Sequence, residues 1–280
     1  MGAIRECFEE TGILLAKRRG SEQLLELSDK DRDHGRHAVH DEKIPFKEWL
    51  NGCRGEADTT SLMPFTRWLT PINVPRRRFS TQMYIYYLPL SSPAFSRAQK
   101  TVPTSDGGIE NTEAHFKPVS EWLRLLKTNE VILFPPQFFL LSLIAPYLKG
   151  TVEGTDMQTL QAQRDTLNDF LRLQEEGEPS WSEKSISPRA IFKLGQRLVM
   201  GLEQAGPELE ETERSGDGKR VLVWEMRDGR PQDLEVRWRA DVERERKEAQ
   251  EGGRPVHVVT REEAERERNE HQWSVGRQKL

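Results

Sequence analysis

The run from Arg5 to Ile13 places three glutamates on one side of a predicted helix. It reads Arg-Glu-Cys-Phe-Glu-Glu-Thr-Gly-Ile, and no glycine or proline interrupts it before Gly12. A helix that ends at a left-handed glycine fits this pattern. Residues at positions i, i+3 and i+4 share a helical face, so the carboxylates form one stripe. The stripe consists of Glu6, Glu9 and Glu10.

Such a stripe is unfavourable unless something positive offsets it. Each like-charged pair on an exposed helix costs a few tenths of a kcal/mol. Ligands that offer only oxygen favour Mg²⁺ or Mn²⁺ over zinc. We therefore predict a divalent-cation site here, against the alternative of a solvated acidic helix end. Cys7 occupies an apolar position of the run, where a free cysteine behaves as a small hydrophobic residue.

The bulk composition restricts the class of protein. A net charge of −4 argues against general nucleic-acid binding, which needs a basic surface. Two cysteines provide neither a disulfide framework nor zinc spacing, which is consistent with a reducing compartment. The most apolar stretch, residues 131–148, is broken by three prolines, so no membrane span is expected. We expect a soluble, intracellular protein that acts on a small molecule.

Composition shifts divide the chain into three predicted parts. Residues 1–150 form the first domain, with a polar, partly helical insertion at about 17–62. Residues 151–238 form a helical and hairpin extension, and residues 239–280 a charged tail that is helical or disordered. Within these parts we predict strands at 79–88 and 111–116 and helices at 120–126 (capped by Ser120), 135–148, 156–174 and 190–202. A hairpin is predicted from 219–226 with 234–238 around Asp228-Gly229.

Several downstream segments, taken in order with the run 5–13, carry a family resemblance. The run matches the second half of the pattern G-x5-E-x7-R-E-U-x-E-E-x-G-U, where U is aliphatic. The later segments are Trp68-Leu69-Thr70-Pro71, Arg77-Arg78-Phe79 with Thr81, Gly107-Gly108-Ile109-Glu110, Trp122 and Phe134-Pro135-Pro136-Gln137. Over about residues 3–150 the chain resembles the coenzyme A and acyl-coenzyme A diphosphatase subgroup of the Nudix hydrolase family.

The resemblance implies both a fold and a reaction. The fold is an α/β/α sandwich of the Nudix type, here truncated at its N-terminus, with a helical insertion and a charged C-terminal extension. The reaction is Mg²⁺- or Mn²⁺-dependent hydrolysis of a diphosphate, an acid anhydride. The substrates expected in this subgroup are coenzyme A and its acyl derivatives, which would yield 3′,5′-ADP and a phosphopantetheine product.

The resemblance also implies roles for individual residues. Glu6 is the candidate catalytic base and a metal ligand, and Arg5 orients it. Glu9 and Glu10 are further metal ligands, joined by Glu110 from a later loop. Three consecutive arginines are the candidate phosphate contacts because guanidinium groups bind phosphate bidentately. These are Arg76, Arg77 and Arg78.

The first half of the Nudix pattern would lie before Met1. We therefore expect the chain as written to bind metal weakly and to turn over little substrate, because the strands that support the helix in the family would also lie there. The alternative function is an inactive Nudix-derived scaffold or interaction protein. The last residues, Gln278-Lys279-Leu280, share two of three positions with a peroxisomal signal, which adds the peroxisome to cytoplasm and mitochondrion as expected compartments.

Overall fold

The structure is a computed structural model that describes residues 1–71, 78–90, 115–150, 155–209, 211–227 and 230–260. The chain forms two compact units. The first contains the described residues of 1–63 and 84–116, and the second those of 64–83 and 117–275. Strands β3 (Leu62–Leu69) and β4 (Ser80–Tyr86) each pass from one unit into the other.

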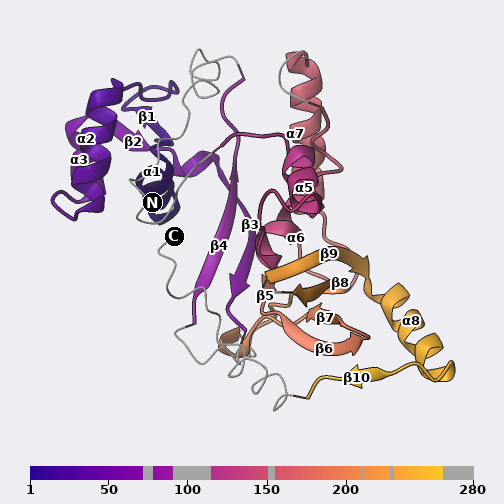
Figure 1. Ribbon diagram of the computed structural model, residues 1–280. Helices are drawn as coiled ribbons and strands as arrows, with labels where there is room; N and C mark the ends of the chain where they lie inside the picture. Colours follow the sequence, from indigo (N-terminus) through magenta and orange to yellow (C-terminus); the bar gives the residue numbers. More distant parts are fainter. Residues whose placement is uncertain (72–77, 91–114, 151–154, 210, 228–229, 261–280) are drawn as a thin grey trace. The chain divides into compact units, whose positions relative to one another are not determined.

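The first unit is built around the N-terminal helix α1. Two helices that lie within the predicted insertion, α2 and α3, pack together beside it (Figure 1). Strands β1 and β2 pair antiparallel, with Lys17 opposite Glu56. The elements are α1 (Gly2–Thr11), β1 (Ala16–Arg18), α2 (Asp29–His40), α3 (Phe46–Gly52), β2 (Gly55–Ala57) and the 3₁₀ turn η1 (Thr59–Ser61).

Aromatic packing holds α1 against the insertion. Phe8 is fully buried, and its ring stacks on Trp49 with centroids 4.7 Å apart. Gly35 of α2 lies directly beneath that indole, where a Cβ would come within 2.2 Å of its atoms. The insertion therefore supplies the apolar surface on which α1 rests. The buried core of this unit comprises Ile4, Phe8, Ala16, Val39, Phe46 and Leu50.

The second unit contains a five-stranded antiparallel sheet in the order β10-β6-β7-β8-β9. Its strands are β6 (Arg189–Leu194), β7 (Arg197–Leu202), β8 (Asp217–Arg227), β9 (Arg230–Trp238) and β10 (Val256–Val258). A smaller sheet has the order β4-β3-β5, with β5 (Ser185–Ile186) parallel to β3. The helices are α5 (Val119–Lys127), α6 (Pro135–Ile144), α7 (Met157–Arg172) and α8 (Arg239–Glu251), with a 3₁₀ turn η2 at Pro207–Leu209.

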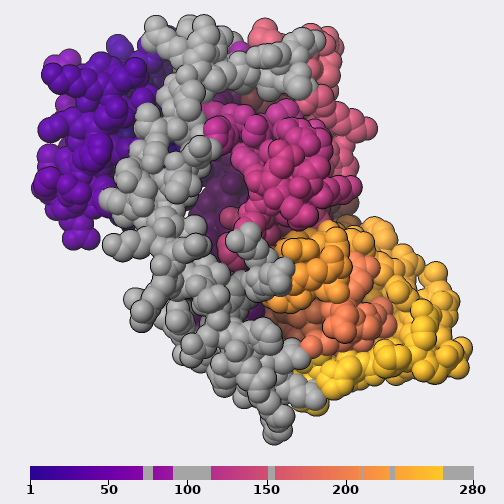
Figure 2. Space-filling view, viewed as in Figure 1, coloured from indigo at the N-terminus to yellow at the C-terminus, as the bar shows by residue number. Residues whose placement is uncertain are grey.

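The larger sheet is covered on both faces. Successive strand residues point to opposite faces, so Val221 and Val223 of β8 face away from Arg220. On their face, Val242 of α8 joins the valine cluster. Figure 2 shows the surface formed by these strands with α8 and β10, coloured orange to yellow. An aromatic cluster centred on buried Trp181 forms a second core; its rings contact those of Phe65, Phe139 and Phe170.

Most predicted elements are confirmed, with shifted ends. Strands β8 and β9 pair as the predicted hairpin, α7 matches the helix predicted at 156–174, and α6 begins at Pro135 but ends at Ile144. Helix α5 begins at Val119 after Pro118, without the predicted side-chain cap from Ser120. Of the strand predicted at 111–116, residues 111–114 lie outside the described residues, and 115–116 form no strand.

One prediction differs more deeply from the structure. The helix predicted at 190–202 is wrong: the segment is the β6–β7 hairpin, which turns at Gly195 with φ 60°. The predicted boundaries at residues 150 and 238 stay predictions; the described residues of 117–275 lie in one compact unit, in which β10 pairs with β6. In the described part of the charged tail, β10 thus adds a strand to the sheet, and α8 packs against β8 and β9. None of the helices in the described ranges is both long and apolar enough to cross a membrane.

Candidate active site

Helix α1 presents the glutamate stripe as the sequence predicts. It spans Gly2–Thr11 and ends at Gly12, which adopts the left-handed conformation with φ 72° and donates its N–H to the Phe8 carbonyl. Ile4 and Phe8 are fully buried on one side. The local signals in the run 5–13 predict this geometry, because the glycine cap and the apolar spacing act within a few residues.

Arg5 joins two of the three glutamates. Its Nη1 lies 3.0 Å from both carboxylate oxygens of Glu9, and its Nη2 contacts Oε1 of Glu6. The Glu6 side chain is half exposed, at 51%, whereas that of Glu9 is only 10% exposed. One guanidinium nitrogen thus contacts both oxygens of Glu9, and the other contacts Glu6, through charge-assisted hydrogen bonds. Arg5 therefore holds the Glu9 carboxylate and contacts the predicted base, Glu6.

Arg36 of α2 anchors the end of α1 from the other side. It is only 4% exposed, and its Nε and Nη2 donate to the backbone carbonyls of Glu9 and Glu10 at 2.8 and 2.7 Å. The last carbonyls of a helix lack partners within the helix and carry partial negative charge, so a buried cation there is favourable. Sequence reasoning missed this residue. The only local signal is its place on a stripe with the buried Gly35, Ala38 and Val39.

The cysteine of the motif is not poised as a nucleophile. Burial raises the pKa of the Cys7 thiol, and a nearby Glu10 carboxylate acts in the same direction against a hydrogen bond with Thr11. The pKa of Cys53 is likewise raised by burial. Both thiols are therefore protonated at neutral pH, and neither resembles a reactive thiolate. This agrees with reading Cys7 as a packing residue.

A buried carboxylate organises the segment that follows β2. Asp58 is 4% exposed; its Oδ2 accepts a hydrogen bond from Tyr86 Oη at 2.8 Å, and its Oδ1 lies 3.3 Å from Lys17 Nζ. Burial tends to raise the pKa of Asp58, but hydrogen bonds from Ser61, Tyr86, Thr60 and Lys17 outweigh it, and the pKa is lowered. Burial, followed by the Asp58 hydrogen bond, raises the pKa of Tyr86. Asp58 is therefore ionised, and its contacts connect β1, η1 and β4.

Of the remaining predicted site residues, the structure describes Arg78 and Glu10. Arg78 belongs to the second unit, where its Nε donates to the Thr70 carbonyl at 3.0 Å, so it braces the connection between β3 and β4. Its predicted phosphate contact stays a prediction. Arg76, Arg77 and Glu110 lie outside the described residues. Glu10 is half-buried on α1 next to the Glu9–Arg36 contact.

The residues of α1 match the chemistry of a divalent-cation site. Glu6 and Glu9 offer hard oxygen donors, and both converge on a single cationic group, the Arg5 guanidinium. Within the part of the chain that the structure describes, no three acidic, histidine or cysteine side chains are grouped as a ligand set. The convergent pair fits an Mg²⁺ or Mn²⁺ ion, while the full set of Glu6, Glu9, Glu10 and Glu110 stays a prediction.

An arginine-bridged glutamate stripe on a helix with a left-handed glycine end defines the Nudix class of hydrolase domains. The family model described as the NUDT19 Nudix domain matches residues 1–144. The chain belongs to this family. The resemblance inferred from the run 5–13 and the later segments is thereby confirmed, as is the mixed α/β character of the domain.

A curated relative adds detail to the family assignment. The chain is 30% identical over 151 residues to the acyl-coenzyme A diphosphatase NUDT19 of Xenopus laevis. The match covers 50% of this chain and 37% of the relative, so the chain spans well under half of that protein. No solved structure matches the chain significantly.

Proposed function

We propose that the chain hydrolyses the diphosphate linkage of coenzyme A or acyl-coenzyme A, with 3′,5′-ADP and phosphopantetheine or its acyl derivative as products. The observation that carries the proposal is the bridge from Arg5 to Glu6 and Glu9 on α1. This bridge holds the Glu6 and Glu9 carboxylates of the family motif together, and the Glu6 side chain is half exposed. The named activity of the Xenopus relative supports the substrate class.

The motif residues of α1 have different roles in the proposed reaction. Glu6, which is half exposed, accepts a proton from the attacking water. Glu9 and Glu10 act with Glu6 and Glu110 as ligands for Mg²⁺ or Mn²⁺, the ions that such oxygen donors favour. When bound, the ion neutralises charge on the diphosphate and polarises its phosphorus. Arg5 keeps the Glu6 and Glu9 carboxylates close together. The substrate phosphates are bound by Arg76, Arg77 and Arg78.

The structure gives a physical reason why α1 can serve as a scaffold for this chemistry. A metal site needs ligands whose backbone is fixed by supporting structure. Stacking of Phe8 on Trp49 holds the buried face of α1, and Arg36 holds the carbonyls at its end. The support on which the proposal relies therefore comes from α2 and α3, which sequence reasoning treated as an appended insertion.

The test is cleavage of coenzyme A by the purified chain with Mg²⁺ or Mn²⁺, followed by chromatography of 3′,5′-ADP. The sequence alone predicts little turnover, but because α2 and α3 support α1, we expect metal-dependent product formation that falls by orders of magnitude in Glu9→Gln. Glu48→Gln, an exposed glutamate on α3, is the matched control and should retain the rate. Metal-independent cleavage, or full activity in Glu9→Gln, contradicts the proposal. A folded chain that binds no metal and releases no product favours the alternative, an inactive Nudix-derived scaffold.

A further inference from the structure

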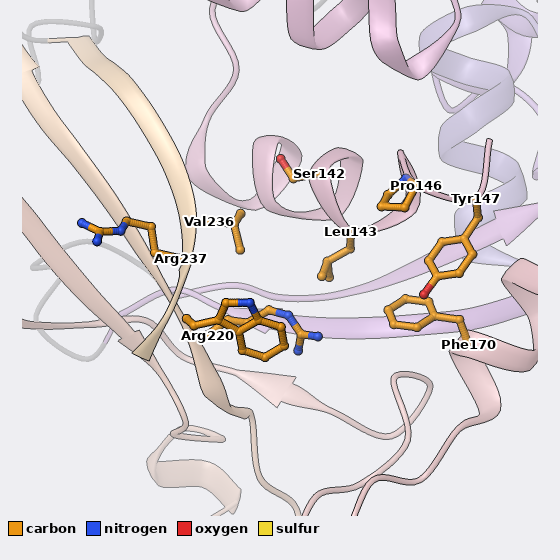
Figure 3. Close-up of a pocket in the computed structure, with 9 residues that line it drawn as sticks. Ser142, Leu143, Pro146, Tyr147, Phe170, Arg220, Val236 and Arg237 are labelled. Atoms are coloured by element: carbon orange, nitrogen blue, oxygen red, sulfur yellow. The ribbon is translucent and has the colours of Figure 1, made fainter. Parts of the chain in front are cut away.

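A pocket of about 350 Å³ lies in the second unit, largely beyond the segment that matches the family model. It opens where the end of α6 and the residues that follow it meet α7 and strands β8 and β9 (Figure 3). Ligand sites in proteins have this size, with mostly apolar and aromatic walls and few polar groups. The walls include Leu143, Tyr147, Phe170, Arg220, Val236 and Trp238.

Aromatic rings give the pocket flat walls. Tyr147 and Phe170 stack on each other with centroids 4.7 Å apart and an interplanar angle of 25°. Trp238, at the end of β9, is 52% exposed although it is a large apolar side chain. Burial raises the pKa of Tyr147, so its hydroxyl remains a neutral donor. Walls of this kind favour a planar ligand, because ring stacking contributes beyond the area that is buried.

One cation, Arg220, faces the aromatic pair. Arg220 and Trp238 are direct cross-strand partners, and the guanidinium carbon lies 4.6 Å from the Trp238 ring and 5.5 Å from the Trp181 ring. Figure 3 shows the guanidinium directed toward Tyr147 and Phe170, whereas that of Arg237 points away from them. A guanidinium held between two indoles and by the buried Asp217, 3.2 Å away, is pre-organised to donate its remaining N–H groups.

The charge balance limits what the pocket can accept. Arg220 is paired with Asp217, and Arg237 with Glu245 at 2.7 Å. Since both arginines in the lining already have a carboxylate partner, a ligand with several anionic groups would be poorly compensated. A ligand with one anionic group can accept hydrogen bonds from the remaining N–H groups of Arg220. This disfavours coenzyme A itself and separates the pocket from the proposed diphosphatase function.

We infer that this pocket binds a small ligand that combines a flat aromatic ring with one anionic group. The ring stacks against the walls formed by Tyr147 and Trp238, and the anion is held by Arg220. A nucleoside monophosphate and an aromatic carboxylic acid both have this chemistry. The inference does not rest on the activity of α1, because it uses only residues of the second unit.

Isothermal titration calorimetry tests the inference, in buffer with chelator so that α1 holds no metal. The probes are AMP and indole-3-acetate, their neutral analogues adenosine and indole, and the ringless anions phosphate and acetate. We expect AMP or indole-3-acetate to bind, its neutral analogue to bind about tenfold more weakly, and the ringless anions not to bind. Which of the two binds identifies the source of the ligand. The absence of binding by both, or equal binding by a neutral analogue, overturns the inference.

Variants locate the binding. Trp238→Leu should weaken the probe about tenfold, the usual effect of removing one stacking ring, and Phe79→Leu, an exposed aromatic outside the pocket, should not. Arg220→Lys keeps a charge for Asp217 but loses the planar fork, so it should weaken the anionic probe and leave its neutral analogue unchanged. Circular dichroism verifies that each variant is folded. Unchanged affinity in both folded pocket variants places the binding elsewhere and overturns the inference.

Discussion

The Nε of Arg36 donates a hydrogen bond of 2.8 Å to the carbonyl of Glu9, a residue of the Nudix motif. The contact joins α2, from the predicted insertion, to the end of α1. Because the bond is to backbone, it positions the glutamate without occupying its carboxylate. The insertion is therefore part of the support of the candidate site, and this can be tested by its effect on stability.

Replacing Arg36 with methionine should destabilise the first unit by about 3 kcal/mol. The change leaves the carbonyls of Glu9 and Glu10 buried without these donors and removes a cation from the helix end. Urea unfolding followed by circular dichroism measures the effect. Arg36→Lys should restore part of the loss, and Arg18→Met, an exposed position on β1, should change the free energy of unfolding by less than about 0.5 kcal/mol. Equal stability of Arg36→Met and the parent would refute the anchoring role.

The packing of α2 on α3 predicts opposite effects for two glycine substitutions. Gly35→Ala should cost about 1–3 kcal/mol, because its Cβ would lie 2.2 Å from the Trp49 ring and force that ring off Phe8. Gly52→Ala, in α3 with nothing within 4 Å of the new Cβ, should stabilise by up to about 1 kcal/mol. Thermal melting of both variants checks the pair. If Gly35→Ala matches Gly52→Ala, the contact between α2 and Trp49 is not as described.

The ionised Asp58 predicts that the stability of the fold decreases at acid pH. Its folded pKa is lowered, so its stabilising contribution is fully present above the unfolded pKa of about 3.9 and is lost as pH falls through the folded value. Asp58→Asn should therefore be about 1–3 kcal/mol less stable than the parent at pH 7. The difference should shrink below about pH 4, as the parent loses its ionised carboxylate. A constant difference from pH 7 to pH 2.5 would contradict this assignment.

Local signals made α1 predictable, because its helix, glutamate stripe and Gly12 cap depend on residues within a few positions of one another. The same holds for the β8–β9 hairpin. The β6–β7 hairpin was misassigned because apolar residues between Ala190 and Leu202 also fit a helical spacing. The segment forms strands because β7 pairs with β8. In that pairing Met200 lies opposite Leu222, more than twenty positions away in the sequence.

Long-range contacts also explain what was missed at the site. Arg36 meets its carbonyl partners 26 and 27 positions away, and nothing in a polar segment marks an arginine as buried. The pocket residues likewise come from segments far apart in the sequence, between Ser142 and Trp238. Sequence patterns predict which residues are suited to metal chemistry, whereas the supporting contacts depend on tertiary packing.

The bridge formed by Arg5 predicts a separation of activity from stability. Arg5→Lys keeps the positive charge but cannot contact both oxygens of Glu9 and Oε1 of Glu6 with the same planar group. Loss of such a supporting contact to metal ligands typically lowers metal affinity or activity about ten- to a hundredfold. We expect that loss in the rate of coenzyme A cleavage at fixed Mn²⁺, with partial recovery as Mn²⁺ is raised. Because the Arg5 side chain is 45% exposed, the free energy of unfolding should change by less than about 1 kcal/mol.

Arg19→Lys is the control for this prediction. The Arg19 side chain lies outside the motif and donates to Asn51 at 2.6 Å, so this variant should keep the parental rate. An Arg5→Lys variant with parental rate and parental Mn²⁺ dependence would show that the bridge does not position the glutamates.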